Sequence, residues 1–232
     1  MGSIKICYRF KLDDDEEEIF DLEFDGDTFE LISDNNERLP LWAKLDFHKC
    51  PHCPLDSKTV PTCPVAKNLS NVVLRFDHIF SYHEIELEVI TKERTVSCKT
   101  TAQRGISSLL GLIFAASGCP HTSYFKPMAR FHLPLSSDNE TIFRVSGMYL
   151  IAQYLLNKED RESDFDFEGL KDIYDNLHLL NTKIADRIRD AVTTDSSVNG
   201  IILLDMLTKL MPIAIDHSLD DMKGLFSQYF KD

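Results

Sequence analysis

The sequence predicts an α+β protein in which a small antiparallel sheet is followed by a mostly helical C-terminal half. Apolar and polar residues alternate over residues 4–12 and 84–100, a pattern typical of half-buried strands. From residue 136 onward, apolar residues recur with the three- and four-residue spacing of helices. The 232 residues are 43% hydrophobic, and this is enough for a sizeable buried core.

The first strands are expected to form a meander. Residues 4–12 and 19–24 should pair as a hairpin, with the acidic run 13–18 as its solvated tip because six like charges repel one another. Asp25-Gly26 indicates a second tight turn, after which residues 28–32 should return as a third strand.

A second hairpin and several helices complete the expected elements. Residues 84–91 and 94–100 should pair with each other and lie beside the meander in one antiparallel sheet. The periodicity predicts helices over 65–80, 106–117, 138–158, 167–192, 196–211 and 217–230. The helix 106–117 is almost wholly apolar and should be buried, and Pro212 is expected to separate the last two helices.

The chain is expected to divide into two regions that pack as one domain. Residues 1–135 should hold the sheet, a Cys- and Pro-rich loop and the buried helix, and residues 136–232 the remaining helices. Charge follows a similar division: residues 1–48 carry 14 acidic and 5 basic side chains (−9), 49–135 carry 6 and 10 (+4), and 136–232 carry 18 and 10 (−8). The positive middle part contains five of the six cysteines, and such surroundings favour thiolates.

Charge and hydropathy restrict the partners and the location of the protein. A net charge of −13 argues against a protein that follows the phosphates of a nucleic acid. The N-terminus lacks the pattern of a signal peptide, and no uninterrupted apolar run reaches the ~18 residues that a membrane span requires. We therefore expect a cytoplasmic protein with no nucleic-acid or membrane partner.

The most informative motif is a set of cysteines that are each followed by proline: Cys50, Cys53, Cys63 and Cys119. Proline keeps the preceding residue out of the helical region, so each of these cysteines should be held in an extended segment or a turn. Two ligands in a C-x2-C pair, a third after nine intervening residues and a distant fourth suit a metal ion or an iron–sulfur cluster. Cys7 and Cys98 lie on expected strands, where packing is the simpler explanation.

Two metal centres fit these four cysteines. Proline after a cluster cysteine occurs in ferredoxin-type sequences, which favours an iron–sulfur cluster. Zinc fits the number of ligands equally well, although turns around zinc-bound sulfurs generally use backbone N–H groups just beyond the cysteine, where proline has none. His52 and His121 each follow in a Cys-Pro-His triplet and could replace a cysteine or contact a sulfur.

Two other interpretations of the same residues are weaker. Cys50-Pro51-His52-Cys53 matches the active-site tetrapeptide of a thioredoxin-like protein oxidant, but Pro54 prevents the long helix that this chemistry needs. Reduced structural cysteines in a Pro-stiffened loop are the remaining alternative. Arg104, Lys126 and Arg130 could offset the charge of thiolates at the centre.

Three functions follow from these patterns. The first is a metal or cluster module for redox sensing, gas sensing or electron transfer, and the second is a zinc-stapled module whose acidic helices recruit a protein partner. Dimerisation through the helices stays open. The third is an enzyme with a pocket between sheet and helices that uses His132, Arg130 or Arg104. No nucleotide, hydrolase or metalloprotease motif is present, which favours a non-enzymatic protein.

Four segments of the chain resemble a known family. They are Cys50-Pro51-His52-Cys53-Pro54-Leu55-Asp56, Cys63-Pro64-Val65-Ala66, Ser117-Gly118-Cys119-Pro120 and Met128-Ala129-Arg130-Phe131-His132-Leu133-Pro134. With these segments the chain is similar to an uncharacterised bacterial family that is catalogued only as a domain of unknown function. The resemblance covers most of the chain and implies a small bacterial cytoplasmic protein. It supplies no activity and no catalytic residues.

Overall fold

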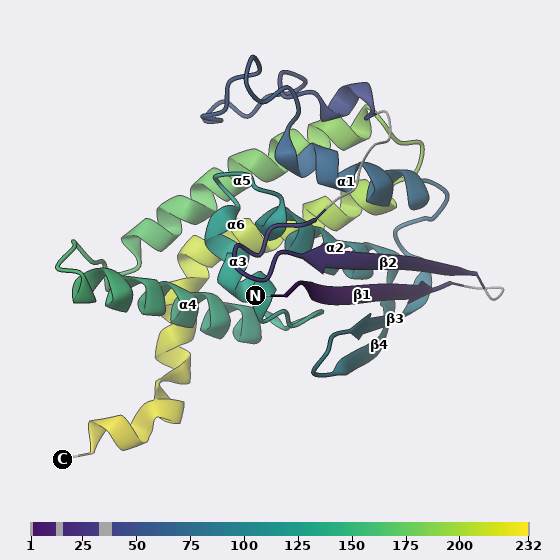
Figure 1. Ribbon diagram of the computed structural model, residues 1–232. Coiled ribbons are helices and arrows are strands. Elements are labelled where there is room, and N and C mark those ends of the chain that lie inside the picture. Colours follow the sequence, from purple (N-terminus) through teal and green to yellow (C-terminus); the bar gives the residue numbers. More distant parts are fainter. Residues whose placement is uncertain (1, 13–15, 33–38, 232) are drawn as a thin grey trace.

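A four-stranded antiparallel sheet forms the N-terminal part of the molecule. The computed structural model describes residues 2–12, 16–32 and 39–231, and Figure 1 shows their arrangement. The strands are β1 (Ile4–Lys11), β2 (Glu17–Phe24), β3 (Glu84–Ile90) and β4 (Thr95–Thr101), and their order in the sheet is β2-β1-β3-β4. The α+β class and the two hairpins are therefore confirmed, and residues 13–15 of the expected acidic tip lie outside the described residues.

The two faces of the sheet differ in polarity. Tyr8 and Phe10 of β1 and Leu87 of β3 are fully buried on the inner face. The outer face carries ion pairs between neighbouring strands, such as Lys11 Nζ to Glu88 Oε1 at 2.8 Å. This alternation places the hydrophobic core on one side of the sheet only.

Two helices of the N-terminal half pack on the inner side. The helix α1 (Pro64–Arg75) follows the Cys-rich loop, and α2 (Ala102–Ala116) starts directly after β4. A methyl group at Gly105 would lie 2.9 Å from atoms of both Ile85 and Phe10, so glycine allows α2 to approach the sheet closely. The α2 helix is thus the buried element around which the rest of the molecule packs.

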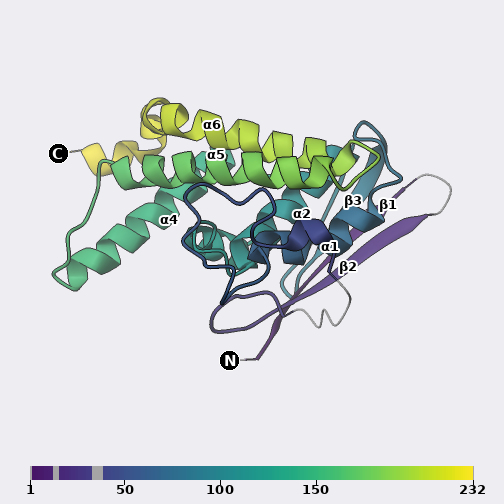
Figure 2. The same ribbon diagram turned by 90° about the horizontal axis from the view of Figure 1, so that it is seen from above.

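The C-terminal half is helical. After the single turn η3 (Ser123–Phe125) and the short helix α3 (Lys126–Arg130), the chain forms three long helices and a terminal 3-10 helix. These are α4 (Asp138–Lys158), α5 (Glu168–Arg189), α6 (Ser196–Met222) and η4 (Lys223–Phe230). Figure 2 shows α5 and α6 side by side as a layer on the side of α2 away from the sheet. A capping box of Ser137 and Glu140 fixes the start of α4, as its sequence periodicity predicts.

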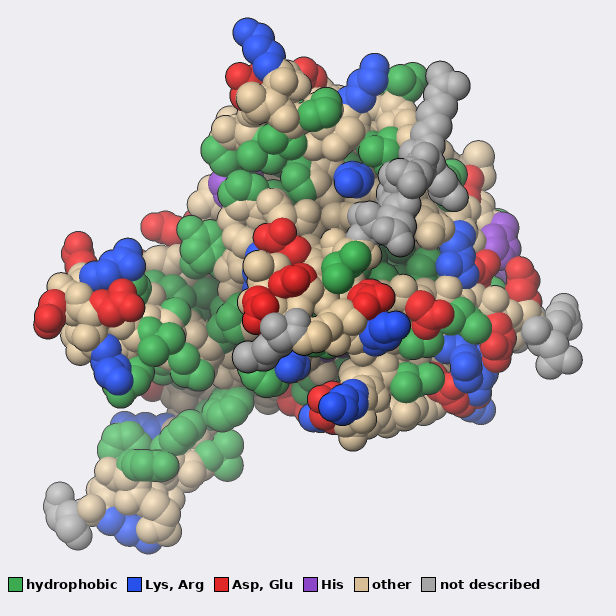
Figure 3. All heavy atoms as spheres, in the orientation of Figure 1, with side chains coloured by type: hydrophobic (Ala, Val, Ile, Leu, Met, Phe, Trp, Pro, Cys, Tyr) green, Lys and Arg blue, Asp and Glu red, His purple; other side chains and the backbone are tan. Residues whose placement is uncertain are grey.

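The end of the chain projects from the body. Figure 1 shows the last part of α6 and η4 leading away from the other elements, and Figure 3 shows apolar side chains along this arm. Leu225 and Tyr229 are 81% and 86% exposed.

The expected third strand at residues 28–32 is wrong. The described residues 28–32 form no strand but an isolated bridge between Phe24 and Leu31, with backbone hydrogen bonds from Asp25 to Glu30 and from Ile32 to Glu23, because Phe29 has a positive φ of 54° that interrupts an extended segment. The Asp25 side chain also accepts hydrogen bonds from the N–H groups of Asp27 and Thr28, which closes a turn. The N–H of Leu31 then donates to the carbonyl of Ala116 at the end of α2.

Two helix predictions also need correction. The helix predicted over 65–80 ends at Arg75, although Phe76 and Ile79 beyond it remain buried. The predicted break at Pro212 does not occur, and α6 runs continuously through this residue. Met211 and Ile215 on either side are completely buried, so packing maintains a helix that the local sequence disfavours.

One helix meets the length and composition of a membrane span. The stretch Ser196–Ile215 of α6 has a mean hydropathy of 1.6 over its 20 residues, and 33% of it is buried inside the molecule. Asp205 and Lys209 interrupt this stretch, so the sequence contains no unbroken apolar run there. Core helices of soluble proteins pass the same test of length and composition, and α6 packs on both α2 and α5.

Candidate metal centre

The loop before α1 carries three of the four Cys-Pro cysteines in a defined conformation. After the short 3-10 turn η2 (Leu41–Ala43), the loop turns at Cys50, where the N–H of Cys53 donates to the Cys50 carbonyl at 3.1 Å. Cys63 precedes Pro64, the first residue of α1, and donates its N–H to the carbonyl of Ala43 at 2.8 Å. Proline suits the first helical position because its missing N–H would have no partner there. The thiol of Cys63 therefore lies at the positive N-terminal end of α1.

The structure brings this loop to the end of α2, where Cys119 lies. Cys63 and Cys119 are 8% and 6% exposed, and Cys50 and Cys53 are partly exposed. Burial and then the negative charges of the three other cysteines raise the pKa of Cys50 to about 12. Burial also raises the pKa of Cys119 to about 11. The four thiols form one cluster, which we call the cysteine cluster, and none of them is in a disulfide.

The sulfurs of the cysteine cluster are close without touching. Within the described part of the chain, no three cysteine sulfurs lie within 4.8 Å of one another. Their charges nevertheless act on one another, since Cys63, Cys119 and Cys53 all oppose ionisation of Cys50.

The turn after α2 directs backbone N–H groups toward Cys119. Gly118 has a φ of 83°, a conformation that glycine adopts without strain, and it lets the chain reverse. The N–H groups of His121 and Thr122 favour the thiolate of Cys119 and so lower its pKa against the effect of burial. The sequence argument against zinc is therefore wrong at this cysteine, because the donors lie two and three residues beyond it and Pro120 does not remove them.

Arg187 is the cation beside the cysteine cluster. It lies on α5, is 1% exposed, and donates to the carbonyls of Trp42 at 2.7 Å, Lys44 at 2.6 Å and Leu45 at 2.9 Å. Burial lowers its pKa, whereas the charges of Cys63, Cys50 and Cys53 raise it. Among the described residues no carboxylate forms an ion pair with this guanidinium, so the neighbouring thiols are the groups that could offset its charge if they ionise.

Arg187 was not predicted as part of the site. Its position in the pattern Leu180, Ile184, Arg187 and Ile188, at helical spacing, would have placed it on the buried face of α5. Two of the three basic residues that were expected at the centre, Lys126 and Arg130, have other partners, and the third, Arg104, lines a cavity beside α2. Lys126 pairs with Glu30 at 2.9 Å, and the Arg130 guanidinium lies over the ring of Phe131.

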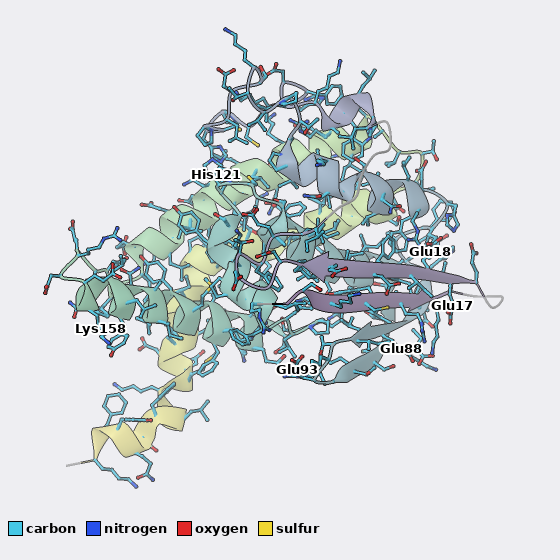
Figure 4. All side chains as sticks on the ribbon, in the orientation of Figure 1. Glu17, Glu18, Glu88, Glu93, His121 and Lys158 are labelled. Atoms are coloured by element: carbon cyan, nitrogen blue, oxygen red, sulfur yellow. The ribbon has the colours of Figure 1, made fainter. Side chains whose placement is uncertain are left out.

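The two histidines of the Cys-Pro-His triplets lie against each other at the edge of the cysteine cluster. Their ring centroids are 4.1 Å apart, and His121 donates from Nε2 to the His52 carbonyl at 3.0 Å. Figure 4 shows His121 between the loop and α5. Both ring nitrogens of His52 are buried without a hydrogen-bond partner, and burial followed by the charge of His121 lowers the pKa of its imidazole. His52 is therefore a neutral ring with an unused lone pair, as a metal ligand requires.

The remaining cysteines lie away from this centre. Cys98 is exposed on β4, and Cys7 lies on β1 beside Asp21, where burial raises the pKa of its thiol to about 11. Another group of metal-binding residue types contains Glu16, Glu18 and His78, whose ligand atoms lie within 4.8 Å of one another. Arg75 binds Glu18 and His78 binds Glu16, so ion pairs within the protein account for this group.

Comparison with known proteins gives one match. A family model described as "Domain of unknown function (DUF6901)" matches residues 6–227. The chain belongs to this family. It matches no curated protein and no solved structure.

Proposed function

We propose that this member of the DUF6901 family is a metal-binding protein whose cysteine cluster holds an iron–sulfur cluster for redox sensing, gas sensing or electron transfer. The observation that carries the proposal is the cluster of four thiols, three of which interact with Arg187, a buried cation without a carboxylate partner among the described residues. A buried charge is expensive unless a counter-charge lies nearby. Thiolates bound to a metal would supply that counter-charge.

The spacing of the sulfurs supports a cluster of several iron atoms over a single zinc ion. Four sulfurs bound to one zinc at about 2.3 Å lie roughly 3.8 Å from one another. No three sulfurs of the cysteine cluster are within 4.8 Å of one another. An iron–sulfur cluster holds its cysteines on different iron atoms and needs the wider arrangement.

The burial of the site also suits this chemistry. Cys63 and Cys119 lie inside the protein, whereas Cys50 and Cys53 face its surface in part. A centre with this arrangement would be shielded on one side and open on the other to a small oxidant, a gas molecule or an electron-transfer partner. Burial, hydrogen bonds to sulfur and the nearby Arg187 are the factors that set the reduction potential of such a centre.

A zinc centre is the second candidate, because the N–H groups of His121 and Thr122 support the thiolate of Cys119. In this case the metal would fasten the loop before α1 to the end of α2. The function would then be the recruitment of a protein partner by the acidic helical half, with no catalysis.

The test is metal analysis together with an absorbance spectrum of the full chain purified without oxygen. We expect about four iron and four sulfide per chain, with absorbance between roughly 300 and 450 nm. One zinc per chain without colour would contradict the iron–sulfur proposal and favour the zinc-stapled module. Protein with six free thiols and no metal would contradict both.

Two matched serine variants connect the metal to the site. Cys53→Ser and Cys98→Ser make the same replacement of sulfur by oxygen, once in the cysteine cluster and once on the exposed face of β4. Only Cys53→Ser should lose iron. Equal iron content in the two variants would show that the metal is bound elsewhere.

A further inference from the structure

A cavity of about 470 Å³ lies beside α2, and none of the four cysteines of the cysteine cluster lines it. This volume is within the ~300–1,000 Å³ range of small-molecule sites. Most of its wall is apolar and comes from α2, α6 and the chain between α2 and α4. Examples of these apolar residues are Leu112, Phe125, Met128, Leu204 and Leu207.

One group of polar residues in the lining of the cavity is connected by hydrogen bonds and charge interactions. The Tyr8 hydroxyl is hydrogen-bonded to Nε2 of His132 and lies 2.9 Å from the Ser108 hydroxyl. Burial and the neighbouring Arg144 lower the pKa of His132 to about 4, so this ring is neutral at physiological pH. Nδ1 of His132 has no hydrogen-bond partner among the described residues and remains available to a ligand.

Two arginines of the lining, Arg144 and Arg104, carry a positive charge. Arg144 donates to the carbonyls of Met128 at 3.1 Å and Phe131 at 2.7 Å through one nitrogen, and no described carboxylate pairs with it. The nearby Glu140 is bound to Ser137 in the capping box. Arg104 stands exposed at the wall of the cavity without a hydrogen bond or ion pair to the described residues.

The formal charges of the lining residues sum to +1. Arg104 and Arg144 contribute two positive charges, Asp138 contributes one negative charge, and His132 is neutral. In a protein with a net charge of −13, the lining of this mostly apolar cavity therefore contains two arginines and one carboxylate, Asp138, while Glu140 outside the lining interacts with Arg144. This combination fits a ligand with an apolar body and a single anionic group.

We propose that the cavity binds a small amphipathic carboxylate, such as a medium-chain fatty acid. Its carboxylate would lie between Arg144 and Arg104, and its apolar body would extend between α2 and α6. Guanidinium groups bind carboxylates with paired hydrogen bonds, so the anionic group fixes the orientation of the ligand. The site uses none of the cysteines and stands apart from the proposed metal centre.

The experiment is calorimetric titration of the full chain with decanoate, below the concentration at which it forms micelles. Decan-1-ol is the matched probe without charge, and decyl phosphate is the matched probe with another anionic group. We expect decanoate to bind at least tenfold more tightly than decan-1-ol, since a charged hydrogen bond is lost in the alcohol. No binding of decanoate, or equal binding of the alcohol, would overturn the proposal. Tighter binding of decyl phosphate would overturn the assignment to a carboxylate.

Variants locate the ligand. Arg104→Met should weaken decanoate binding about tenfold. Its matched control, Arg94→Met in the turn between β3 and β4, should not. Gly111→Leu places a larger side chain into the cavity from α2, where a methyl group would meet only Leu204 at 3.7 Å, and it should abolish binding. Unchanged affinity in both Arg104→Met and Gly111→Leu would show that decanoate binds elsewhere.

Discussion

The cysteine cluster and the cavity, which are the two regions beside α2, each contain an arginine, Arg187 and Arg144. The two arginines bind the backbone in the same way but have different surroundings. Both arginines donate to two or more backbone carbonyls, and neither pairs with a described carboxylate. Arg187 interacts with the thiols of Cys50, Cys53 and Cys63, whereas Arg144 lines a cavity. The cysteine cluster can therefore neutralise its arginine from within the protein, and the cavity cannot.

This difference indicates how each region gains its counter-charge. In the cysteine cluster the thiols must ionise, and burial holds the pKa of Cys50 far above its usual value unless a metal binds. In the cavity the only ring that could add charge, His132, is kept neutral. A ligand would then have to bring the anion.

The largest effect is expected from removing the arginine of the cysteine cluster. Arg187→Met leaves three carbonyls without their donor and the thiols without a cation, so the free energy of unfolding should fall by about 3 kcal/mol. Urea denaturation of the full chain measures this change. Arg189→Met is the control, because Arg189 is exposed and pairs only with Asp186. An equal decrease in the free energy of unfolding in the two variants would show that Arg187 does not stabilise the cysteine cluster.

The second-largest effect is expected from a larger side chain at Gly200, where α6 lies close to α2. A methyl group at Gly200 would lie 2.9 Å from Cγ2 of Ile106 and 3.4 Å from the backbone nitrogen of Ser107. Gly200→Ala should therefore lower the free energy of unfolding by about 2 kcal/mol and weaken decanoate binding, while metal content stays unchanged. Gly224→Ala, where a methyl group meets nothing within 4 Å, is the matched control. Loss of metal in Gly200→Ala would show that the two regions are not separate.

A smaller effect should appear in the pH dependence of stability. His132 has a folded-state pKa of about 4 against an ordinary 6.5, so the unfolded chain binds the proton more readily between these values. Stability should be complete above pH 6.5 and decrease by up to about 2 kcal/mol as the pH falls toward 4. His132→Asn should flatten this part of the curve measured by urea denaturation at several pH values. The same slope in the variant would assign the effect to other groups.

The smallest effect is expected at Lys126, one of the cations that the sequence placed at the metal centre. Its ammonium pairs with Glu30, whose side chain is 54% exposed, so Lys126→Met should change the free energy of unfolding by no more than about 0.5 kcal/mol. Metal content and absorbance should equal those of the unchanged protein. A loss of metal in this variant would restore Lys126 to the centre and weaken the assignment of Arg187.

The sequence was sufficient where a local pattern determines the structure. The capped helix Asp138–Lys158 and the hairpin of β3 and β4 follow from periodicity and turn residues. It was insufficient where distant packing decides, as at Pro212, which lies inside a helix because Met211 and Ile215 are buried. The turn at Asp25 also uses side-chain hydrogen bonds that replace the expected strand.

The candidate site shows the same limit. The prolines marked Cys50, Cys53, Cys63 and Cys119 as unusual without any knowledge of the fold. Arg187 is 68 positions beyond Cys119 in the chain, since 187 − 119 = 68, and only the packing of α5 brings it to the thiols. The cavity depends on the approach of α6 to α2, which no local pattern reveals.

The order of strands in the sheet has a consequence for folding kinetics. β1 pairs with β3 across 81 positions, since Tyr8 faces Val89 and 89 − 8 = 81, whereas both hairpins join neighbouring segments. The hairpins should form early, and closure of the long loop between β1 and β3 should limit the folding rate, because such closure costs chain entropy before its contacts form. Cys50, Cys53 and Cys63 lie inside this loop. The segment that carries these three cysteines is therefore confined before the cysteine cluster assembles, which lowers the chain entropy that remains to be lost.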